Sequence, residues 1–375
     1  MESAGKRVNF IRYIAYLQAI GIVLVVFGHS FHQATGEDAA VCNRIFAIMH
    51  NFRMPLFMFV SGFLMMYTTF CPGKDVTPRR FIRNKFRRLI VPFLFLSVVT
   101  FLPRCFFTPM ADDVVSLNWE SFFKGLFSGY SLTVPTLWFL QASFITLIVC
   151  FTVVWAFKKL SFNLDMAFIL LMVIFMTTLI MPYNVTDFFS LGEVCNLGIF
   201  FVAGMIFCRF GEKVEKYLRL DSPVVFVGFL ALWFGLFLWL EDTPLYFISS
   251  FFGIGMCVSL ARILDSRNIR LLDWIVGSNY IIFLLHWYTA VMSQQVLHHV
   301  LPLHWAWHSL LAFTLGIVLP ILFLRLLQRK APQSRFYSGL LWLLGQNKIR
   351  REVNFNICRD SIVCCPKRDE RSSAR

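Results

Sequence analysis

Long apolar stretches alternate with short polar ones along most of the chain. The apolar stretches are about 17–25 residues long, the length that an α-helix needs to cross the hydrocarbon core of a bilayer. They lack the alternation of apolar and polar residues that the strands of a transmembrane β-barrel require. The pattern therefore predicts an all-α, polytopic membrane protein of about ten transmembrane helices. The expected spans are 10–31, 45–67, 88–108, 136–157, 164–182, 190–208, 223–240, 245–262, 275–297 and 306–327.

Lysine and arginine residues concentrate on every second connection between the expected spans. The connection after the second span carries seven of them, from Lys74 to Arg88, and the stretch from Arg325 to the end carries twelve. Because positively charged connections stay on the cytoplasmic side, both ends of the chain are predicted to be cytoplasmic. We expect one transmembrane domain over 1–335, and an interfacial segment with a basic cytoplasmic tail over 336–375.

The composition excludes a soluble protein. The 375 residues are 58% hydrophobic and 15% charged, whereas a soluble domain has about 45–50% apolar and about 25% charged residues. The net charge of +14 follows the alternating connections, so we expect no nucleic-acid partner. The ten cysteines show neither a CxxC pair nor zinc-finger spacing. His304 and His308 have a spacing that a metal could use, but no acidic or cysteine ligand accompanies them, so no metal site is expected.

Three of the ionisable side chains inside the expected spans are candidates for a functional site. His29 lies near the outer end of the first span, and Arg53 enters the second span at a similar depth. His286 lies within the ninth span, among Ile, Phe and Leu residues. An imidazole can take up a proton near neutral pH, and an ionisable group inside a membrane indicates a functional site. The structural alternative for His29 is an interfacial histidine hydrogen-bonded to a neighbouring helix.

Several short motifs occur in a characteristic order. They are Tyr16–Ile20 with Val25–Ser30, Phe52–Phe57 with Ser61–Phe63, Arg88–Phe93, Leu137–Leu140, Phe200–Gly204 and Tyr280–His286. On these motifs, residues 10–330 resemble the acyltransferase-3 family of integral membrane acyltransferases, most of all the branch with sugar O-acetylases such as the bacterial fucose O-acetylases. The sequence departs from that branch at three positions. It has Gln18 where the family usually has Arg or Lys, Ala15 where Asp is common, and Arg53 where the branch usually has His.

The resemblance implies a membrane O-acyltransferase in the plasma (inner) membrane. Such an enzyme would move an acetyl or other short acyl group from acyl-CoA to a hydroxyl of a cell-surface glycan or lipid-linked sugar. Acetyl-CoA would be a donor substrate, and no permanently bound cofactor is expected. The expected partners are the lipid bilayer, acyl-CoA, a carbohydrate acceptor and glycan-synthesis enzymes.

Acyl transfer needs a base, stabilisation of an oxyanion and a cationic site for the donor's phosphates. The resemblance implies that His29 is the base. Arg53 could stabilise the oxyanion or hold a substrate carboxylate, and its structural alternative is a snorkelling anchor at the outer interface. Arg87 and Arg88, at the membrane edge, are expected to contact the donor's phosphates. Gln18 takes the place of the cation that the family uses for this contact.

The remaining expectations concern the acceptor. Trp138 begins the fourth span on the outer side, where a sugar ring could stack on it, although an interfacial tryptophan is also ordinary. Ser61 and His286 are further candidates for substrate binding. Two other classes stay open: a transporter or flippase for a polysaccharide intermediate, and a second type of membrane O-acyltransferase that would use His286 in place of His29.

Overall fold

The computed structural model describes residues 2–31, 37–70, 76–106, 119–127, 136–180, 188–267, 269–300 and 304–346. Within these ranges the chain forms helices and their connections, and no β-strand. The prediction of an all-α fold is therefore confirmed. The predicted basic tail beyond residue 346 lies outside the described residues.

A helix occupies each of the ten stretches predicted as spans. They are α1 (Glu2–Gly28), α2 (Glu37–Met65), α4 (Val91–Phe106), α6 (Trp138–Lys159), α7 (Leu164–Ile180), α8 (Leu191–Leu218), α9 (Pro223–Leu240), α10 (Phe247–Arg267), α12 (Asn279–Val300) and α13 (Trp305–Lys330). The shorter elements are η1 (Met66–Phe70), α3 (Pro78–Lys85), η2 (Phe86–Ile90), α5 (Trp119–Phe127), η4 (Pro244–Tyr246), α11 (Arg270–Val276) and α14 (Arg335–Leu343).

Six helical segments of the described residues are long and apolar enough to cross a bilayer. They are Ala39–Phe70, Trp138–Lys159, Leu191–Leu218, Pro223–Leu240, Pro244–Arg267 and Trp305–Lys330. Arg12–Gly28 and Leu164–Ile180 are shorter apolar helices. The chain is thus a helical membrane protein, while the count of ten spans and the cytoplasmic position of both ends stay predictions.

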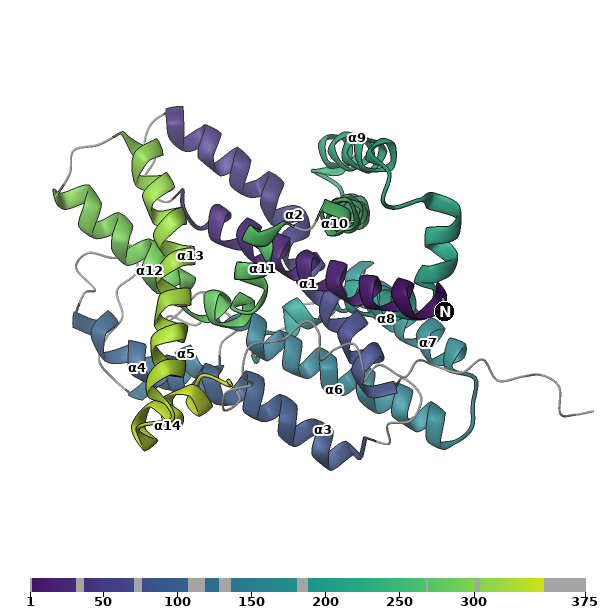
Figure 1. Ribbon diagram of the computed structural model, residues 1–375, viewed down its shortest axis with the longest axis horizontal. Helices are drawn as coiled ribbons and strands as arrows, with labels where there is room; N and C mark the ends of the chain where they lie inside the picture. The colour runs from purple at the N-terminus through teal and green to yellow at the C-terminus, as the bar shows by residue number, and fades with distance from the viewer. Residues whose placement is uncertain are drawn as a thin grey trace, which may run out of the picture.

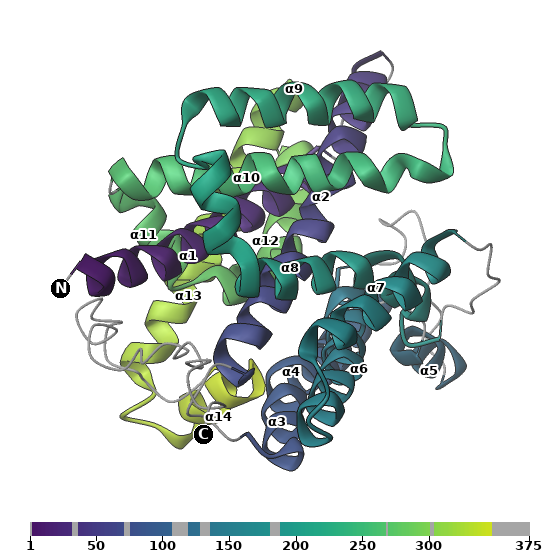
Figure 2. The ribbon, with the colours of Figure 1, turned by 90° about the vertical axis from the view of Figure 1, so that its right-hand side faces the viewer.

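Helix α1 lies in the middle of the bundle, with α2, α10 and α12 around it (Figures 1 and 2). Its apolar residues are buried along its length, among them Tyr13, Leu17 and Val26. Polar contacts near residues 12–16 hold α1 against α10 and α11. Arg12 Nε lies 3.2 Å from Asp265 Oδ1 at the end of α10, and Tyr16 Oη donates a hydrogen bond of 2.8 Å to Asp273 Oδ1 of α11. These contacts set the position of α1 and of the residues that follow it.

Helices α2 and α8 approach each other backbone to backbone. A Cβ atom at Gly62 would collide with the carbonyl of Phe201, and one at Gly204 would collide with the carbonyl of Phe59. Small residues at a helix interface permit this approach in membrane proteins, where packing rather than hydrophobic burial holds helices together. The contact fixes the position of α2, the helix that carries Arg53.

Asn51 fixes the rotation of α2 against α9 and α10, which run side by side (Figure 2). Its Nδ2 atom donates to Ser249 Oγ at 2.9 Å, and its Oδ1 atom accepts from Trp233 Nε1 at 3.1 Å. Its backbone carbonyl accepts from Ser250 Oγ at 2.8 Å. Buried polar groups that are fully paired specify one arrangement of the helices. Arg53 lies two residues further along α2, so these hydrogen bonds also set the direction in which its side chain leaves the helix.

Candidate active site

The rings of His29 and His286 face each other, with centroids 5.4 Å apart. His29 follows the last residue of α1 and is half-buried. His286 lies in the second turn of α12 and is fully buried. Two histidines predicted in different spans therefore form one site.

Hydrogen bonds to the backbone fix the protonation pattern of His286. Its Nδ1 atom lies 2.8 Å from the carbonyl oxygen of Phe283 and 3.1 Å from that of Ile282. A carbonyl oxygen can only accept, so Nδ1 carries the hydrogen. In the neutral ring Nε2 is then unprotonated, and this buried atom has no hydrogen-bond partner among the described residues. His286 thus presents a basic nitrogen inside the bundle.

Arg53 is the third member of the site. Its side chain is 3% exposed, so the interpretation of Arg53 as a snorkelling interfacial anchor does not fit. The guanidinium carbon lies 4.5 Å from the ring centroid of Phe46, and that ring meets the ring of His29 edge-on at 6.2 Å. A Cβ atom at Gly28 would collide with Arg53 Nη1. The guanidinium therefore lies against the backbone directly before His29.

Two residues of this site were not found from the sequence. Phe46 links His29 to Arg53, and it also stacks on His50 with centroids 5.6 Å apart. Gly28 supplies the space for the guanidinium. The signal for Phe46 was its spacing, because residues 46, 50 and 53 recur at intervals of four and three and lie on one face of a helix. Nothing in the sequence alone indicated that Gly28 meets Arg53.

The basic residues near the start of α12 form a second group. The guanidinium carbon of Arg88 lies 5.4 Å from the ring centroid of Tyr280, and Tyr280 Oη donates to the carbonyl oxygen of Arg88. Arg87 has other contacts. Its guanidinium carbon lies 5.7 Å from the ring centroid of Trp342 on α14, and its Nη2 atom lies 3.4 Å from the carbonyl oxygen of Gln346. Of these two arginines, Arg88 is the one that contacts the helix that carries His286.

Lys85 belongs to the same group, although the sequence did not single it out. Burial, and then the positive charge of Arg88, lower the pKa of Lys85 from its ordinary value of 10.5 to about 8. Its Nζ atom lies 5.4 Å from the ring centroid of Phe81. Arg88 thus lies beside the first turn of α12, and Lys85 adds a second positive charge that interacts with it. Their spacing of three residues on a helix was the signal that could have paired them.

A family model described as an acyltransferase domain (Acyl_transf_3) matches residues 11–325. The chain belongs to the acyltransferase-3 family. No curated protein and no solved structure matches it significantly. The match covers all of the helices that carry the two groups described above, so this acyltransferase keeps a histidine pair and a basic cluster within its family domain. The chain is accordingly a membrane acyltransferase.

The other candidate residues of the acyltransferase lie away from the histidine pair. Gln18 is half-buried on α1, eleven residues or about 16 Å before His29. Ser61 is half-buried on α2 beside Gly62. Trp138 begins α6, with its ring 5.8 Å from that of Phe139. Within the described ranges, no hydrogen bond or ring contact joins these three side chains to His29 or His286, so their proposed roles stay predictions.

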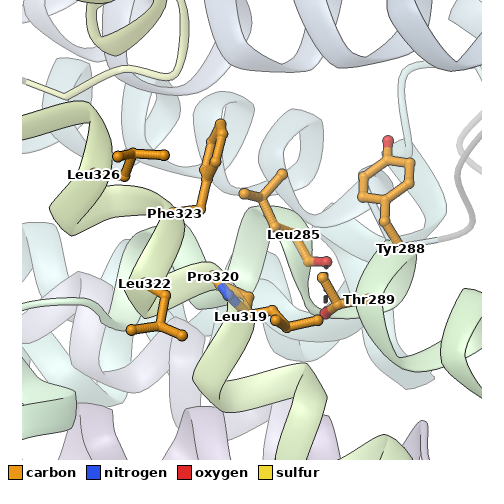
Figure 3. Close-up of a pocket in the computed structure, with 8 residues that line it drawn as sticks. All are labelled: Leu285, Tyr288, Thr289, Leu319, Pro320, Leu322, Phe323 and Leu326. Atoms are coloured by element: carbon orange, nitrogen blue, oxygen red, sulfur yellow. Dashed lines mark hydrogen bonds between the residues drawn. The ribbon is translucent and has the colours of Figure 1, made fainter. Parts of the chain in front are cut away.

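A separate groove of about 580 Å³ lies between α12 and α13 (Figure 3). Thr289 donates a hydrogen bond of 3.2 Å to the carbonyl of Leu285 at its wall. The lining is otherwise largely apolar and suits hydrocarbon rather than sugar. His286 is not part of it. The lining residues are Leu285, Tyr288, Thr289, Leu319, Pro320, Leu322, Phe323 and Leu326.

Proposed function

We propose that this membrane acyltransferase moves an acetyl group from cytoplasmic acetyl-CoA to a hydroxyl of a cell-surface glycan or lipid-linked sugar. The plasma membrane is the proposed location. The observation that carries the proposal is the pair of histidines: the rings of His29 and His286 lie 5.4 Å apart, and Nε2 of His286 has no hydrogen-bond partner among the residues that the structure describes.

His29 is proposed as the base. The hydroxyl oxygen of the acceptor attacks the carbonyl carbon of the thioester, so a C–O bond forms and the C–S bond breaks. The hydroxyl proton passes to the imidazole of His29. The imidazolium then gives this proton to the departing thiolate, so coenzyme A is released as the thiol and His29 returns to its neutral form. His286 is proposed as the partner of His29, since its ring lies 5.4 Å away and its tautomer leaves Nε2 as an unprotonated nitrogen. The two rings would share the proton during the reaction.

Helix α12 connects the proposed donor site to the histidines. Arg88 contacts Tyr280 at the start of this helix, and His286 follows six residues later, about 9 Å along the axis. Phe283 lies between them, with its ring 6.2 Å from that of His286. We propose that Lys85 and Arg88 bind the phosphates of the donor, while its acyl-carrying arm follows α12 toward His286.

Aromatic rings surround this proposed route. The rings of Phe57 and Phe139 lie 6.2 Å and 5.5 Å from that of Phe283, and the first two lie 5.9 Å apart. An apolar surround of this kind excludes water from a thioester, and it strengthens electrostatic interactions within the site. It also favours the thin, largely apolar arm of the donor over a sugar. The acceptor is therefore proposed to reach the histidines from the opposite, outer side.

The test uses the purified full chain in lipid nanodiscs, with labelled acetyl-CoA and a panel of oligosaccharides. Label should appear as an alkali-sensitive ester on the glycan, and His29→Ala should abolish it. Transfer that survives His29→Ala but not His286→Ala would assign the chemistry to the second type of membrane O-acyltransferase. Movement of glycan across a liposome membrane without any thioester would favour the transporter or flippase, and the proposal would be wrong.

A further inference from the structure

The guanidinium of Arg53 has hydrogen-bond donors without acceptors. The side chain is 3% exposed, and its Nε and Nη1 atoms have no hydrogen-bond partner among the described residues. Its contact with the ring of Phe46 is a cation–π interaction, which provides no hydrogen-bond acceptor for the Nε and Nη1 donors. Buried polar groups are nearly always paired in native proteins, so each exception needs an explanation.

No carboxylate neutralises this charge in the part of the chain that the structure describes. The ion pairs there use other arginines: Arg12 with Asp265, Arg44 with Glu241, Arg209 with Asp165, and Arg262 with Glu215. The described ionisable groups that interact electrostatically with Arg53 include His50 and His286, and neither of these is an acid. A buried cation without a counter-ion is unfavourable, and an anionic ligand would relieve this.

The position of Arg53 selects which anion can arrive. The backbone of Gly28 contacts Nη1, so the unpaired donors lie directly beside His29, where the acceptor hydroxyl must come. Arg44, on the same helix, pairs with Glu241 at the C-terminal end of α9. Arg53 lies nine residues after Arg44, about 13 Å further along α2, so the two arginines occupy different sites. The proposed donor phosphates lie instead by Lys85 and Arg88 at the start of α12. The anion at Arg53 therefore belongs to the acceptor.

We propose that Arg53 binds an oxyanion carried by the acceptor, a carboxylate or a phosphate ester, and that the preferred acceptors are acidic glycans. This inference rests on the proposed function, because it assumes that the acceptor hydroxyl meets His29. A guanidinium can bind an oxyanion with two parallel N–H groups, either Nε with Nη2 or Nη1 with Nη2. Each of these pairs includes one of the two unpaired donors of Arg53. Binding the anion there holds the neighbouring hydroxyl within reach of His29.

The experiment compares matched acceptors and matched variants. The acceptors are methyl glucuronide, the neutral methyl glucoside and a hexose phosphate, each with saturating acetyl-CoA in nanodiscs. The variants are Arg53→Gln, Arg53→Lys and the control Arg44→Gln, which removes a partly exposed arginine of the same helix. In Arg53→Gln we expect KM for the charged acceptor to rise about tenfold or more, because charge-assisted hydrogen bonds are lost. In the same variant, KM for the glucoside and kcat for the charged acceptor should change little. In Arg44→Gln, KM and kcat should stay close to the wild-type values for all three acceptors.

The other outcomes are equally distinct. A fall in kcat that is equal for acidic and neutral acceptors, with KM unchanged, would show that Arg53 stabilises the oxyanion of the reaction, and would overturn the inference. Equal KM values for all three acceptors in the wild type would overturn it as well. A response to the glucuronide alone, or to the hexose phosphate alone, identifies the anion as carboxylate or phosphate.

Calorimetry of acceptor binding without donor separates this inference from the proposed function. Charge-selective binding that Arg53→Gln abolishes supports the anion site even if no acetyl transfer occurs, in which case only the proposed reaction fails. If Arg53→Gln does not fold, Arg53→Lys and the wild-type comparison still decide. Lysine keeps the positive charge but lacks the planar arrangement of N–H donors, so Arg53→Lys should bind acidic acceptors with an intermediate affinity. If the wild type binds methyl glucuronide, hexose phosphate and methyl glucoside with equal affinity, the inference is wrong.

Discussion

His29 and His286 form a pair across the bundle, with ring centroids 5.4 Å apart, although one follows the first helix and the other lies on α12. The Nδ1 atom of His286 is held by the carbonyl of Phe283. This leaves its Nε2 atom unprotonated in the neutral ring. We propose that the two histidines act as a unit, with His286 assisting His29.

Replacement of His286 by Gln should show this unit behaviour. We expect His29→Gln to lower the rate of acetyl transfer by about 10²–10⁴-fold, the range for loss of a general base. His286→Gln should lower it less, and should change the shape of the pH–rate profile. The double variant should be no slower than His29→Gln alone, because residues that act together are not additive. Initial rates with labelled acetyl-CoA measure this. A double variant whose loss equals the product of the single losses would show that the two rings act independently.

Gly28→Ala tests the contact between Gly28 and Arg53. A methyl group there would collide with Arg53 Nη1, and the guanidinium, at the end of a flexible side chain, would move away. Because Arg53 is proposed to bind the anion of the acceptor, KM for an acidic acceptor should rise about tenfold or more, as in Arg53→Gln, while the fold survives. The control is Gly228→Ala on α9, where an added Cβ atom meets nothing within 4 Å. Rates and unfolding temperatures are measured for both. Full activity in Gly28→Ala would mean that the position of the guanidinium is unimportant.

Arg88→Gln should weaken binding of the donor. One charge-assisted hydrogen bond contributes roughly 1.5–3 kcal/mol, so the dissociation constant should rise about tenfold or more. Arg87→Ala should have a smaller effect, because Arg87 contacts Trp342 and Gln346 instead of α12. The control is Arg80→Gln, which removes an exposed arginine from α3. Calorimetric titration with coenzyme A gives the affinities.

Gln18→Arg completes that comparison. It restores the cation that the family usually has, so it should leave donor affinity unchanged or increase it. If it prevents folding, and neither Arg87→Ala nor Arg88→Gln alters affinity, then position 18 is packed core. The basic cluster would in that case serve only to orient the protein in the membrane.

Lys85 should make donor binding depend on pH. Its pKa is about 8 in the free protein, lowered first by burial and then by Arg88. Donor phosphates favour the protonated form, so binding raises this pKa and takes up a proton. Affinity should therefore be high below pH 8 and weaken by up to about tenfold from pH 7 to pH 9. Lys85→Arg keeps its charge throughout this range and should abolish the dependence. A pH dependence that persists in Lys85→Arg would assign it to another group.

The sequence by itself determined the helices. The stretch expected at 223–240 is α9 (Pro223–Leu240), and the segment expected to follow the last span, from residue 336 onward, begins with α14 (Arg335–Leu343). These agree because hydropathy and helical hydrogen bonds are local properties of consecutive residues. The family was likewise evident from local motifs, and the same motifs placed His29, Arg53 and His286 among the candidates.

Only the tertiary structure decided which of these candidates meet. The pairing of His29 with His286, and of Arg53 with Gly28, depends on how α1, α2 and α12 are rotated and how closely they pack. Contacts between helices set those quantities, such as the approach of Gly62 and Gly204 to the facing backbones and the hydrogen bonds of Asn51 to α9 and α10. No local pattern records them, because a helical period gives the face on which a residue lies but not the partner that this face will meet.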